Sequence, residues 1–284
     1  MATANELDPR IHPWRPEIAA KSLEGVVTAA RFVEGETANL CIGQAGLFKD
    51  PRPDAEQVSE LRFGERFCIY DRIEGYAWGQ CGTDEYVGWV AETALVVGEV
   101  EITHLVRAQY SHIYAVPNIR SQIVELLPIG ARLAVEREQE GYAVLLGGRG
   151  LVPAQHLLKR VAPVADWVAI AEQFLGAPYL WGGKTARGID CSGLVQVALE
   201  FSGLEAPRDT DLQAMALGHA VARSAELQRG DIVFWQGHVG IMLDGTYLLH
   251  ANAHHMMVAA EPLEVAEKRI SANEYGPITV IKRL

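Results

Sequence analysis

The chain has 284 residues, 49% of them hydrophobic, and a formal net charge of −11 at pH 7. This length is sufficient for two or three domains with buried cores. The excess of acidic side chains argues against nucleic acid or an anionic membrane surface as a partner.

Neither end of the sequence nor its interior predicts a membrane segment. No apolar run reaches the roughly 18 residues of a membrane-spanning helix, and residues 1–20 have charged side chains but no apolar segment typical of a signal peptide. The four cysteines form no CxxC pair, so a disulfide framework is not expected. These features predict a reducing, cytoplasmic location.

The first part of the chain is expected to consist of an arm and a small β-barrel. Residues 1–25 have an irregular pattern with a short helical piece around residues 16–23. Residues 26–98 then alternate short apolar runs with turn residues, which favours a barrel of short strands. The strands are expected at residues 26–33, 38–42, 66–70, 76–80 and 86–90.

A second copy of this pattern follows. Leu61, Gly64 and the run Glu74-Gly75-Tyr76-Ala77 recur 66 positions later as Leu127, Gly130 and Glu140-Gly141-Tyr142-Ala143. Two long, strand-rich units favour tandem barrels over a solenoid, which needs at least about three repeats. The segment EGYAWGQCGTDEYVGWV resembles bacterial SH3-like domains. We therefore expect such domains at residues 26–98 and 99–160.

The remaining residues, 164–284, predict an α+β domain. Helical periodicity runs from Val164 to Leu175 and ends at Gly176, and a second helix is expected at about residues 191–202. A polar loop follows at residues 207–213. Strands are expected at residues 231–235, 239–243, 247–251 and 279–281. Helices followed by an antiparallel sheet are typical of the α+β class.

Cys191 lies where this second helix begins. A thiol at the start of a helix meets the positive end of the helix dipole, which favours a reactive thiolate. A single cysteine is also often only a small buried apolar residue. The nucleophile hypothesis therefore depends on a base elsewhere in the domain.

Two histidines are candidates for the base and its partner. His238 precedes an apolar strand and His250 ends the next one. A three-residue hairpin loop, Leu243-Asp244-Gly245, would pair Met242 with Thr246. That register would place His238 directly opposite His250, on the same face of the sheet. The alternative is a pair of solvated histidines at strand ends.

The sequence gives little support for a metal. The adjacent His254 and His255 would point to opposite faces of a strand. Neither an HExxH motif nor a carboxylate–histidine spacing suitable for zinc is present. We predict neither a metal nor another cofactor.

Several separate motifs in the last domain resemble the NlpC family of cysteine peptidases, which have a compact papain-like fold. They are PYLWGGKTARGIDCSGLVQ, APRDTDLQ, GDIVFWQGHVGIML and YLLHANA. The resemblance implies that Cys191 is the nucleophile, His238 the general base and His250 the orienting residue. It also places Tyr179 and the Cys191 N–H at the oxyanion. Family members hydrolyse the bond between γ-D-glutamate and an L-diamino acid in peptidoglycan stem peptides.

The order of the domains resembles a subgroup of these γ-D-glutamyl-L-diamino-acid endopeptidases. In that subgroup bacterial SH3-like domains precede the peptidase domain, and acidic and hydroxyl groups hold the free N-terminal L-alanine of the substrate. The matching positions are Asp190, Ser192, Thr210 and Tyr86, with Glu65 as a further candidate, whereas Arg208 is expected to be structural. A peptidoglycan-derived peptide is then the expected partner, with no obligate protein partner evident.

The resemblance leaves several functions open. The favoured function is a hydrolase that recycles murein peptides through a thioester acyl-enzyme. Alternatives are an endopeptidase that remodels the intact cell wall, a related thiol acyltransferase, and a non-catalytic module that binds peptidoglycan. The sequence leaves open whether the diamino acid is diaminopimelate or lysine.

Overall fold

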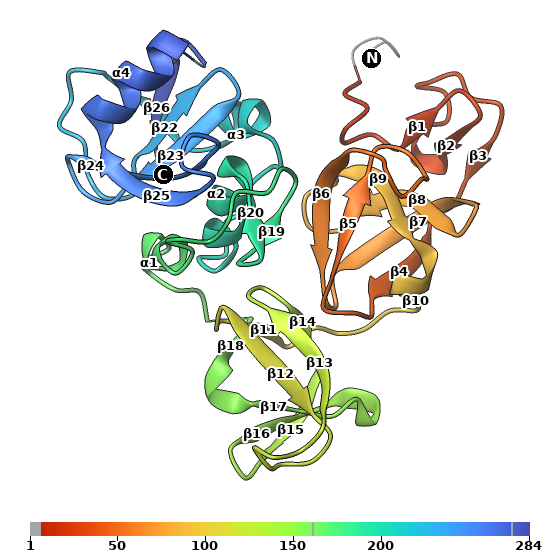
Figure 1. Cartoon of the computed structure of the whole chain (residues 1–284). Helices are drawn as coiled ribbons and strands as arrows, with labels where there is room; N and C mark the ends of the chain where they lie inside the picture. Colours follow the sequence, from red (N-terminus) through yellow and green to blue (C-terminus); the bar gives the residue numbers. More distant parts are fainter. Residues whose placement is uncertain (1–6, 161, 274) are drawn as a thin grey trace. The chain divides into compact units, whose positions relative to one another are not determined.

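The computed structural model describes residues 7–160, 162–273 and 275–284, and it divides into two compact units, Met1–Ala162 and Pro163–Leu284 (Figure 1). Among the described residues, none of the helices combines the length and apolar character that a bilayer crossing requires. Each unit has its own sheets and buried core.

The first unit begins with a β-barrel whose strands are joined by tight turns. A seven-stranded sheet has the order β10-β4-β7-β8-β9-β5-β6, and its core contains Leu40, Leu61, Phe67 and Val90. Its elements are β4 (Glu36–Leu40), β5 (Gln44–Phe48), β6 (Gln57–Arg62), β7 (Arg66–Ile73), β8 (Tyr76–Cys81), β9 (Val87–Ala91), the 3₁₀ helix η3 (Glu92–Ala94) and β10 (Leu95–Val97). The alternating apolar pattern therefore predicts most strands of this sheet, although the strand expected at residues 26–33 is wrong for most of its length.

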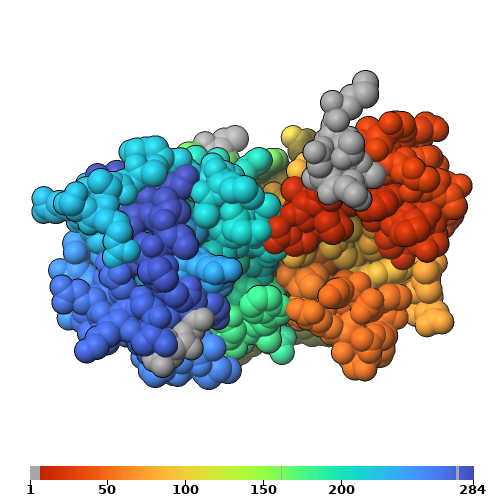
Figure 2. Space-filling model, turned by 90° about the horizontal axis from the view of Figure 1, so that it is seen from above, coloured from red at the N-terminus to blue at the C-terminus, as the bar shows by residue number. Residues whose placement is uncertain are grey.

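The arm before the barrel differs from the prediction. It forms a small three-stranded sheet and one 3₁₀ turn in place of the expected helical piece, namely β1 (Trp14–Arg15), β2 (Ile18–Ala20), η2 (Lys21–Leu23) and β3 (Phe32–Val33). The Arg15 guanidinium lies 4.2 Å from the ring centroid of Trp78 and 4.7 Å from that of Trp89, and it pairs with Asp71 at 2.6 Å. Tertiary contacts of this kind override local helical propensity. In Figure 2 the arm, in red, lies on the surface of the first unit.

The second half of the first unit forms two further small sheets. One has the order β14-β11-β18 and the other β13-β12-β17-β16-β15. Phe63 from the first barrel is buried in their core, beside Val106, Ile113 and Leu127. The elements are β11 (His104–Val106), β12 (Tyr110–Tyr114), β13 (Ile123–Pro128), β14 (Arg132–Leu133), β15 (Val135–Gln139), β16 (Tyr142–Leu145), η4 (Leu146–Gly148), β17 (Leu151–Pro153), η5 (Ala154–His156) and β18 (Leu157–Lys159).

The sequence repeat corresponds to a repeated backbone conformation. The turn before β8 has φ of +51° at Glu74 and +82° at Gly75, and the turn before β16 has +53° at Glu140 and +79° at Gly141. Both turns connect antiparallel strand pairs, β7–β8 and β15–β16. A left-handed turn closed by glycine is typical of tight hairpins, which explains why this Glu-Gly pair recurs.

The second unit packs helices against one antiparallel sheet of order β21-β26-β22-β23-β24-β25. Helix α2 contacts β23 and β24, whereas α4 contacts β24 and β25. The elements are α1 (Val168–Glu172), β19 (Lys184–Thr185), β20 (Gly188–Ile189), α2 (Cys191–Glu200), α3 (Thr210–Ala216), β21 (His219–Val221), β22 (Ile232–Trp235), β23 (His238–Met242), β24 (Tyr247–Asn252), β25 (Met257–Pro262), α4 (Leu263–Asn273) and β26 (Val280–Arg283).

Two expected elements of this unit differ from the structure. Helix α1 covers only Val168–Glu172, because the chain after it continues in i→i+3 hydrogen bonds up to Gly176, where φ is +83°. The expected polar loop at residues 207–213 instead enters helix α3 at Thr210. Both differences concern where a helix begins or ends, and apolar periodicity locates such boundaries poorly.

Candidate active site

Cys191 is the first residue of α2, the helix that packs on β23. The Asp190 side chain caps this helix by accepting the Gly193 N–H at 2.7 Å. Gly193 permits the close approach of the preceding turn, because a Cβ at this position would lie 2.5 Å from the Gly183 carbonyl oxygen. The Cys191 thiol accepts a hydrogen bond from the Val239 N–H at the start of β23. The thiol therefore lies at the end of β23 where His238 begins the strand.

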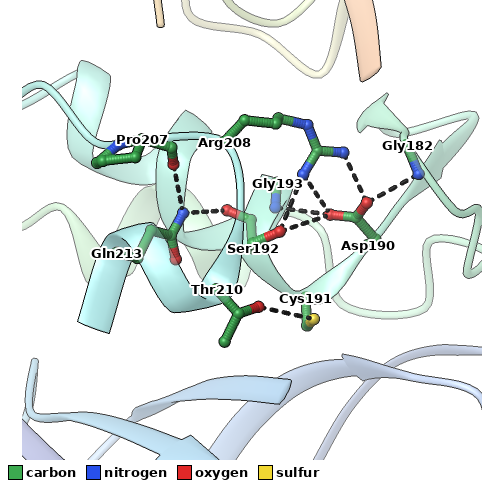
Figure 3. A network of polar contacts seen from close by, with 9 residues as sticks. All are labelled: Gly182, Asp190, Cys191, Ser192, Gly193, Pro207, Arg208, Thr210 and Gln213. Atoms are coloured by element: carbon green, nitrogen blue, oxygen red, sulfur yellow. Dashed lines mark hydrogen bonds and ion pairs between the residues drawn. The ribbon is translucent and has the colours of Figure 1, made fainter. Parts of the chain in front are cut away.

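Asp190 is the centre of a buried polar network (Figure 3). Its carboxylate forms an ion pair with Arg208, with N–O distances of 3.0 Å and 2.6 Å. It also accepts the Gly182 N–H at 2.8 Å and the Ser192 hydroxyl at 3.3 Å. With the Gly193 N–H, the Asp190 carboxylate accepts five hydrogen bonds. A carboxylate has only about four lone-pair positions, so none is left for a further donor. A substrate ammonium at Asp190 would have to displace one of them. Arg208 has the structural role that the sequence predicts.

One hydroxyl group lies beside the thiol, and a second belongs to the Asp190 network. The Thr210 hydroxyl oxygen is 3.9 Å from the Cys191 sulfur, and the Ser192 hydroxyl accepts from Arg208 at 2.9 Å. Helix α3 is held in place by Gln213, whose amide donates to the Ser192 and Pro207 carbonyl oxygens (Figure 3). Thr210 therefore lies beside the Cys191 thiol and Ser192 beside Asp190, and their roles toward substrate stay predictions.

The protonation state of Cys191 differs from the expectation of a thiolate. Burial, and next the Asp190 carboxylate, raise the pKa of the thiol to about 11. The Thr210 hydroxyl, the Val239 N–H and Arg208 act in the opposite direction and are weaker. Desolvation therefore has a larger effect on the pKa of the thiol than its position at the start of the helix, and the thiol is protonated at neutral pH.

His238 and His250 contact one another through their ring nitrogens. Nε2 of His238 is 2.8 Å from Nδ1 of His250, and both side chains are buried. Burial, and next the neighbouring His250, lower the pKa of His238 to about 3. Burial also lowers the pKa of His250. Both rings are therefore neutral at pH 7.

The two histidines share a face of the sheet, but the predicted register is wrong by two residues. Met242 pairs with Leu248 and Leu243 with Tyr247, so Thr246 belongs to the turn. The Asp244 carboxylate causes this, because it accepts the N–H groups of Thr246 and Tyr247 at 2.7 Å and 2.8 Å. The histidines are consequently diagonal neighbours. A shift of two residues preserves the face to which a side chain points.

A glutamate that the sequence analysis did not select completes this group. Glu261 on β25 is 2.9 Å from His250 Nε2, and Arg269 on α4 donates to both of its oxygens at 2.8 Å and 2.7 Å. His250 pairs with Ala259 across β24 and β25, so Glu261 is a diagonal neighbour on the same face. The apolar pattern of β25 gave no signal for this contact.

Aromatic residues surround His238. Tyr275 stacks on its ring with a centroid distance of 5.5 Å and an interplanar angle of 9°, and Trp235 lies 5.6 Å away at 43°. Burial, then the neighbouring Cys191, raise the pKa of Tyr179 above its ordinary value. The Tyr179 hydroxyl therefore keeps its proton and can donate a hydrogen bond close to the thiol.

The predicted residues of the first unit lie inside it. Glu65 forms a buried pair with Arg62, whose Nε donates at 3.0 Å. Tyr86 belongs to the apolar core of the first barrel and is only 5% exposed. Both positions have a clear structural use within the barrel, and their roles toward substrate stay predictions.

Three side chains of the second unit are close enough to share a cation. His250, His255 and Glu261 each have a ligand atom within 4.8 Å of the others. However, Arg269 already neutralises the Glu261 carboxylate, and a guanidinium repels a metal ion at the same place. This cluster is better suited to holding a histidine than to binding a cation.

Two family models match the chain. One, described as the NlpC/P60 family, matches residues 176–272, and the other, described as the bacterial dipeptidyl-peptidase Sh3 domain, matches residues 47–95. Residues 176–272 form an NlpC/P60 domain. The matched segment contains Cys191, His238, His250 and Glu261. An NlpC/P60 peptidase domain thus follows a bacterial SH3 domain in this chain.

Relatives match the chain over different lengths. The chain is 26% identical to dipeptidyl-peptidase 6 of Lysinibacillus sphaericus over 73% of its own length and 84% of the relative. It is 38% identical to the γ-D-glutamyl-L-lysine dipeptidyl-peptidase of Bacillus subtilis, over 30% of this chain and 31% of that protein. An NlpC/P60 protein of Bacillus cereus has the same fold, with a TM-score of 0.74 and 19% identity over 87% of this chain and 99% of that one.

Proposed function

We propose that this protein is a cysteine peptidase that hydrolyses the bond between γ-D-glutamate and an L-diamino acid in peptidoglycan stem peptides. The single observation that carries the proposal is the placement of Cys191 at the start of α2, beside β23 and its hydrogen-bonded pair His238–His250. The relatives named dipeptidyl-peptidases support the substrate class. An amide bond held next to a thiol and a histidine base is open to nucleophilic catalysis.

The chemistry follows from the neutral state of both partners. As the sulfur of Cys191 attacks the γ-carbonyl carbon, His238 takes the thiol proton. The Tyr179 hydroxyl and the Cys191 N–H donate to the developing oxyanion. His238 then transfers the proton to the amine of the diamino acid, which leaves as the C–N bond breaks. Water hydrolyses the thioester, so the products are an L-Ala-γ-D-Glu dipeptide and the free amine.

We further propose that the substrate has a free N-terminal L-alanine. Thr210 presents a hydroxyl group beside the thiol, and the Ser192 hydroxyl lies beside Arg208 and Asp190. Asp190 supplies negative charge at the same place, although Arg208 compensates it, and Tyr86 is the candidate from the first barrel. A closed site with buried acceptors penalises a substrate that lacks the matching donor.

Mass spectrometry of peptide products tests these proposals together. The full chain is incubated with L-Ala-γ-D-Glu-diaminopimelate, the lysine analogue, the N-acetylated tripeptides and intact sacculi, with a Cys191→Ala variant as control. We expect L-Ala-γ-D-Glu from the free-amine tripeptides only, and no product with the variant. Cleavage of sacculi or acetylated peptide would favour an endopeptidase of the intact wall, and transfer to an added amine would favour an acyltransferase. Absence of any product would favour a binding module.

The domain organisation is a second part of the proposal. We propose an arm at residues 1–25, SH3-like domains at residues 26–98 and 99–160, and the peptidase domain at residues 164–284. The repeated turns at Glu74-Gly75 and Glu140-Gly141 support a second SH3-like domain. Limited proteolysis of the full chain should cut first near residue 162, whereas early cuts inside either half would contradict these bounds. A cytoplasmic location is proposed with it, and cell fractionation tests that.

A further inference from the structure

Glu261 and Arg269 form an ion pair behind the two histidines. On the basis of the proposed function, we infer that this pair fixes the tautomers of both rings, so that His238 presents an unprotonated Nδ1 to the thiol of Cys191. Glu261 is then a positioning residue that acts through His250. Hydrogen bonds join the His238 ring through His250 to the Glu261 carboxylate and the Arg269 guanidinium, and the Cys191 thiol contacts Val239, the residue after His238.

Glu261 is negatively charged at neutral pH. Burial alone would raise the pKa of this carboxyl, but hydrogen bonds from His250 and Arg269 outweigh burial and hold the pKa below its ordinary range. Arg269 contributes two N–H groups, one to each oxygen. An ionised carboxylate can only accept hydrogen bonds.

The charge of Glu261 then decides which nitrogen of His250 has the proton. Nε2 of His250 is 2.9 Å from Glu261 Oε1, so Nε2 must donate. Burial lowers the pKa of His250, and a neutral imidazole has only one N–H. Nδ1 of His250 is therefore an acceptor.

The tautomer of His250 in turn fixes the tautomer of His238. Nδ1 of His250 lies 2.8 Å from Nε2 of His238, so His238 must donate from Nε2. This ring is also neutral, since burial lowers its pKa to about 3. Its Nδ1 then has a free lone pair, which is the state a general base requires. With the opposite tautomers throughout, His238 would direct an N–H at the thiol and could not accept the proton.

An ordinary structural ion pair is the competing explanation, and the same unit contains a suitable comparison. The buried carboxylate of Asp231 accepts two hydrogen bonds from Arg283, both at 2.7 Å. Both pairs join a carboxylate to an arginine, from β25 for Glu261 and from the residue before β22 for Asp231, but no histidine contacts Asp231 in the hydrogen bonds described for it. Asp231→Asn therefore measures the cost of breaking such a pair without affecting the histidines.

The direct test is the protonation pattern of the His238 ring. Histidine-¹⁵N NMR of the full chain distinguishes a protonated from an unprotonated ring nitrogen, and a His238→Asn variant assigns the signals. We expect the wild-type ring to have its proton on Nε2. In Glu261→Gln the amide can accept from or donate to His250, so a second tautomer should appear. Asp231→Asn should keep the wild-type pattern. A wild-type proton on Nδ1, or an unchanged pattern in Glu261→Gln, would overturn the inference.

Kinetics provide a second test that does not depend on one variant. We expect Glu261→Gln to lower kcat at least about tenfold, up to the roughly 10⁴-fold loss seen where a tautomer-fixing carboxylate is replaced by its amide, with KM little changed. Loss of charge compensation in Arg269→Gln should raise the pKa of Glu261 and move the acid limb of kcat to higher pH. The charges that act on His238 are those of His250, Arg269 and Glu261; Tyr275 stacks on its ring, and the Cys191 thiol contacts the next residue, Val239.

These outcomes separate the inference from the proposed function. Cys191 alkylation by iodoacetamide, followed on the peptide that contains it, needs no substrate and still depends on proton removal by His238. If the wild-type protein cleaves no peptide but Glu261→Gln slows alkylation of Cys191, the function fails and the inference survives. If Glu261→Gln retains wild-type kcat and alkylation rate, or if Asp231→Asn lowers kcat of the folded protein as much, the inference is wrong.

Discussion

Replacing Arg208 with methionine should destabilise the NlpC/P60 domain strongly. The guanidinium is buried and forms two hydrogen bonds with Asp190. Methionine fills much of the same volume but removes the charge. Asp190 would then be a buried carboxylate beside the thiol without a cation.

The magnitude follows from the contacts that remain. Removing one partner of a buried ion pair costs about 3–5 kcal/mol. Asp190 would keep the N–H groups of Gly182 and Gly193 and the Ser192 hydroxyl, so we expect the lower end of this range, about 3 kcal/mol. For a unit of this size that corresponds to a fall in the unfolding midpoint of roughly 12 °C.

Calorimetry of the full chain measures this change. Arg229→Met is the matched control. Like Arg208, Arg229 forms ion pairs within the second unit, here with Asp166 and Glu172, but its side chain is partly exposed. Its loss should cost about 1 kcal/mol or less. The double variant Arg208→Met/Asp190→Asn should regain at least half of the lost stability. If Arg208→Met behaves like Arg229→Met, backbone donors alone stabilise Asp190 and the reasoning is refuted.

Three further predictions concern other parts of the chain. Because burial raises the pKa of Cys191 to about 11, its alkylation rate should still increase at about pH 10; a plateau below about pH 8 would indicate a preformed thiolate. Tyr275→Leu should lower kcat about 2- to 10-fold through loss of ring stacking on His238, whereas Tyr275→Phe should retain it, and equal kcat values would exclude a role for stacking. Arg15→Met should destabilise the first unit by about 1–2 kcal/mol through loss of contact with Trp78, measured by urea unfolding; an unchanged midpoint would contradict this.

The sequence predicts the parts of the site that depend on short-range patterns. The position of Cys191 follows from a turn-prone segment before an apolar helix, and the common face of His238 and His250 follows from strand alternation. Their register was wrong because the loop length depends on Asp244, whose carboxylate closes a wider turn. A side-chain acceptor of this kind does not appear in an apolar pattern.

The parts that the sequence did not reveal depend on long-range contacts. Glu261 meets His250 only because β25 pairs with β24, and Arg269 reaches Glu261 from the following helix. The charge state of Cys191 was also mispredicted, because helix position is visible in a sequence whereas the extent of desolvation is not. Burial of polar groups becomes known only once the packing is known.

The protonated state of Cys191 also affects how the protein tolerates oxidants. Peroxide reacts with a thiolate and much less with a thiol, and oxidation beyond the sulfenic acid is irreversible for most proteins. Under the proposed function, a Cys191 thiol that keeps its proton until a peptide carbonyl is in place is largely protected from oxidation while no substrate is bound. The cost of ionising the buried sulfur, which would slow the first step of the proposed mechanism, would then also prolong the time for which the protein stays active.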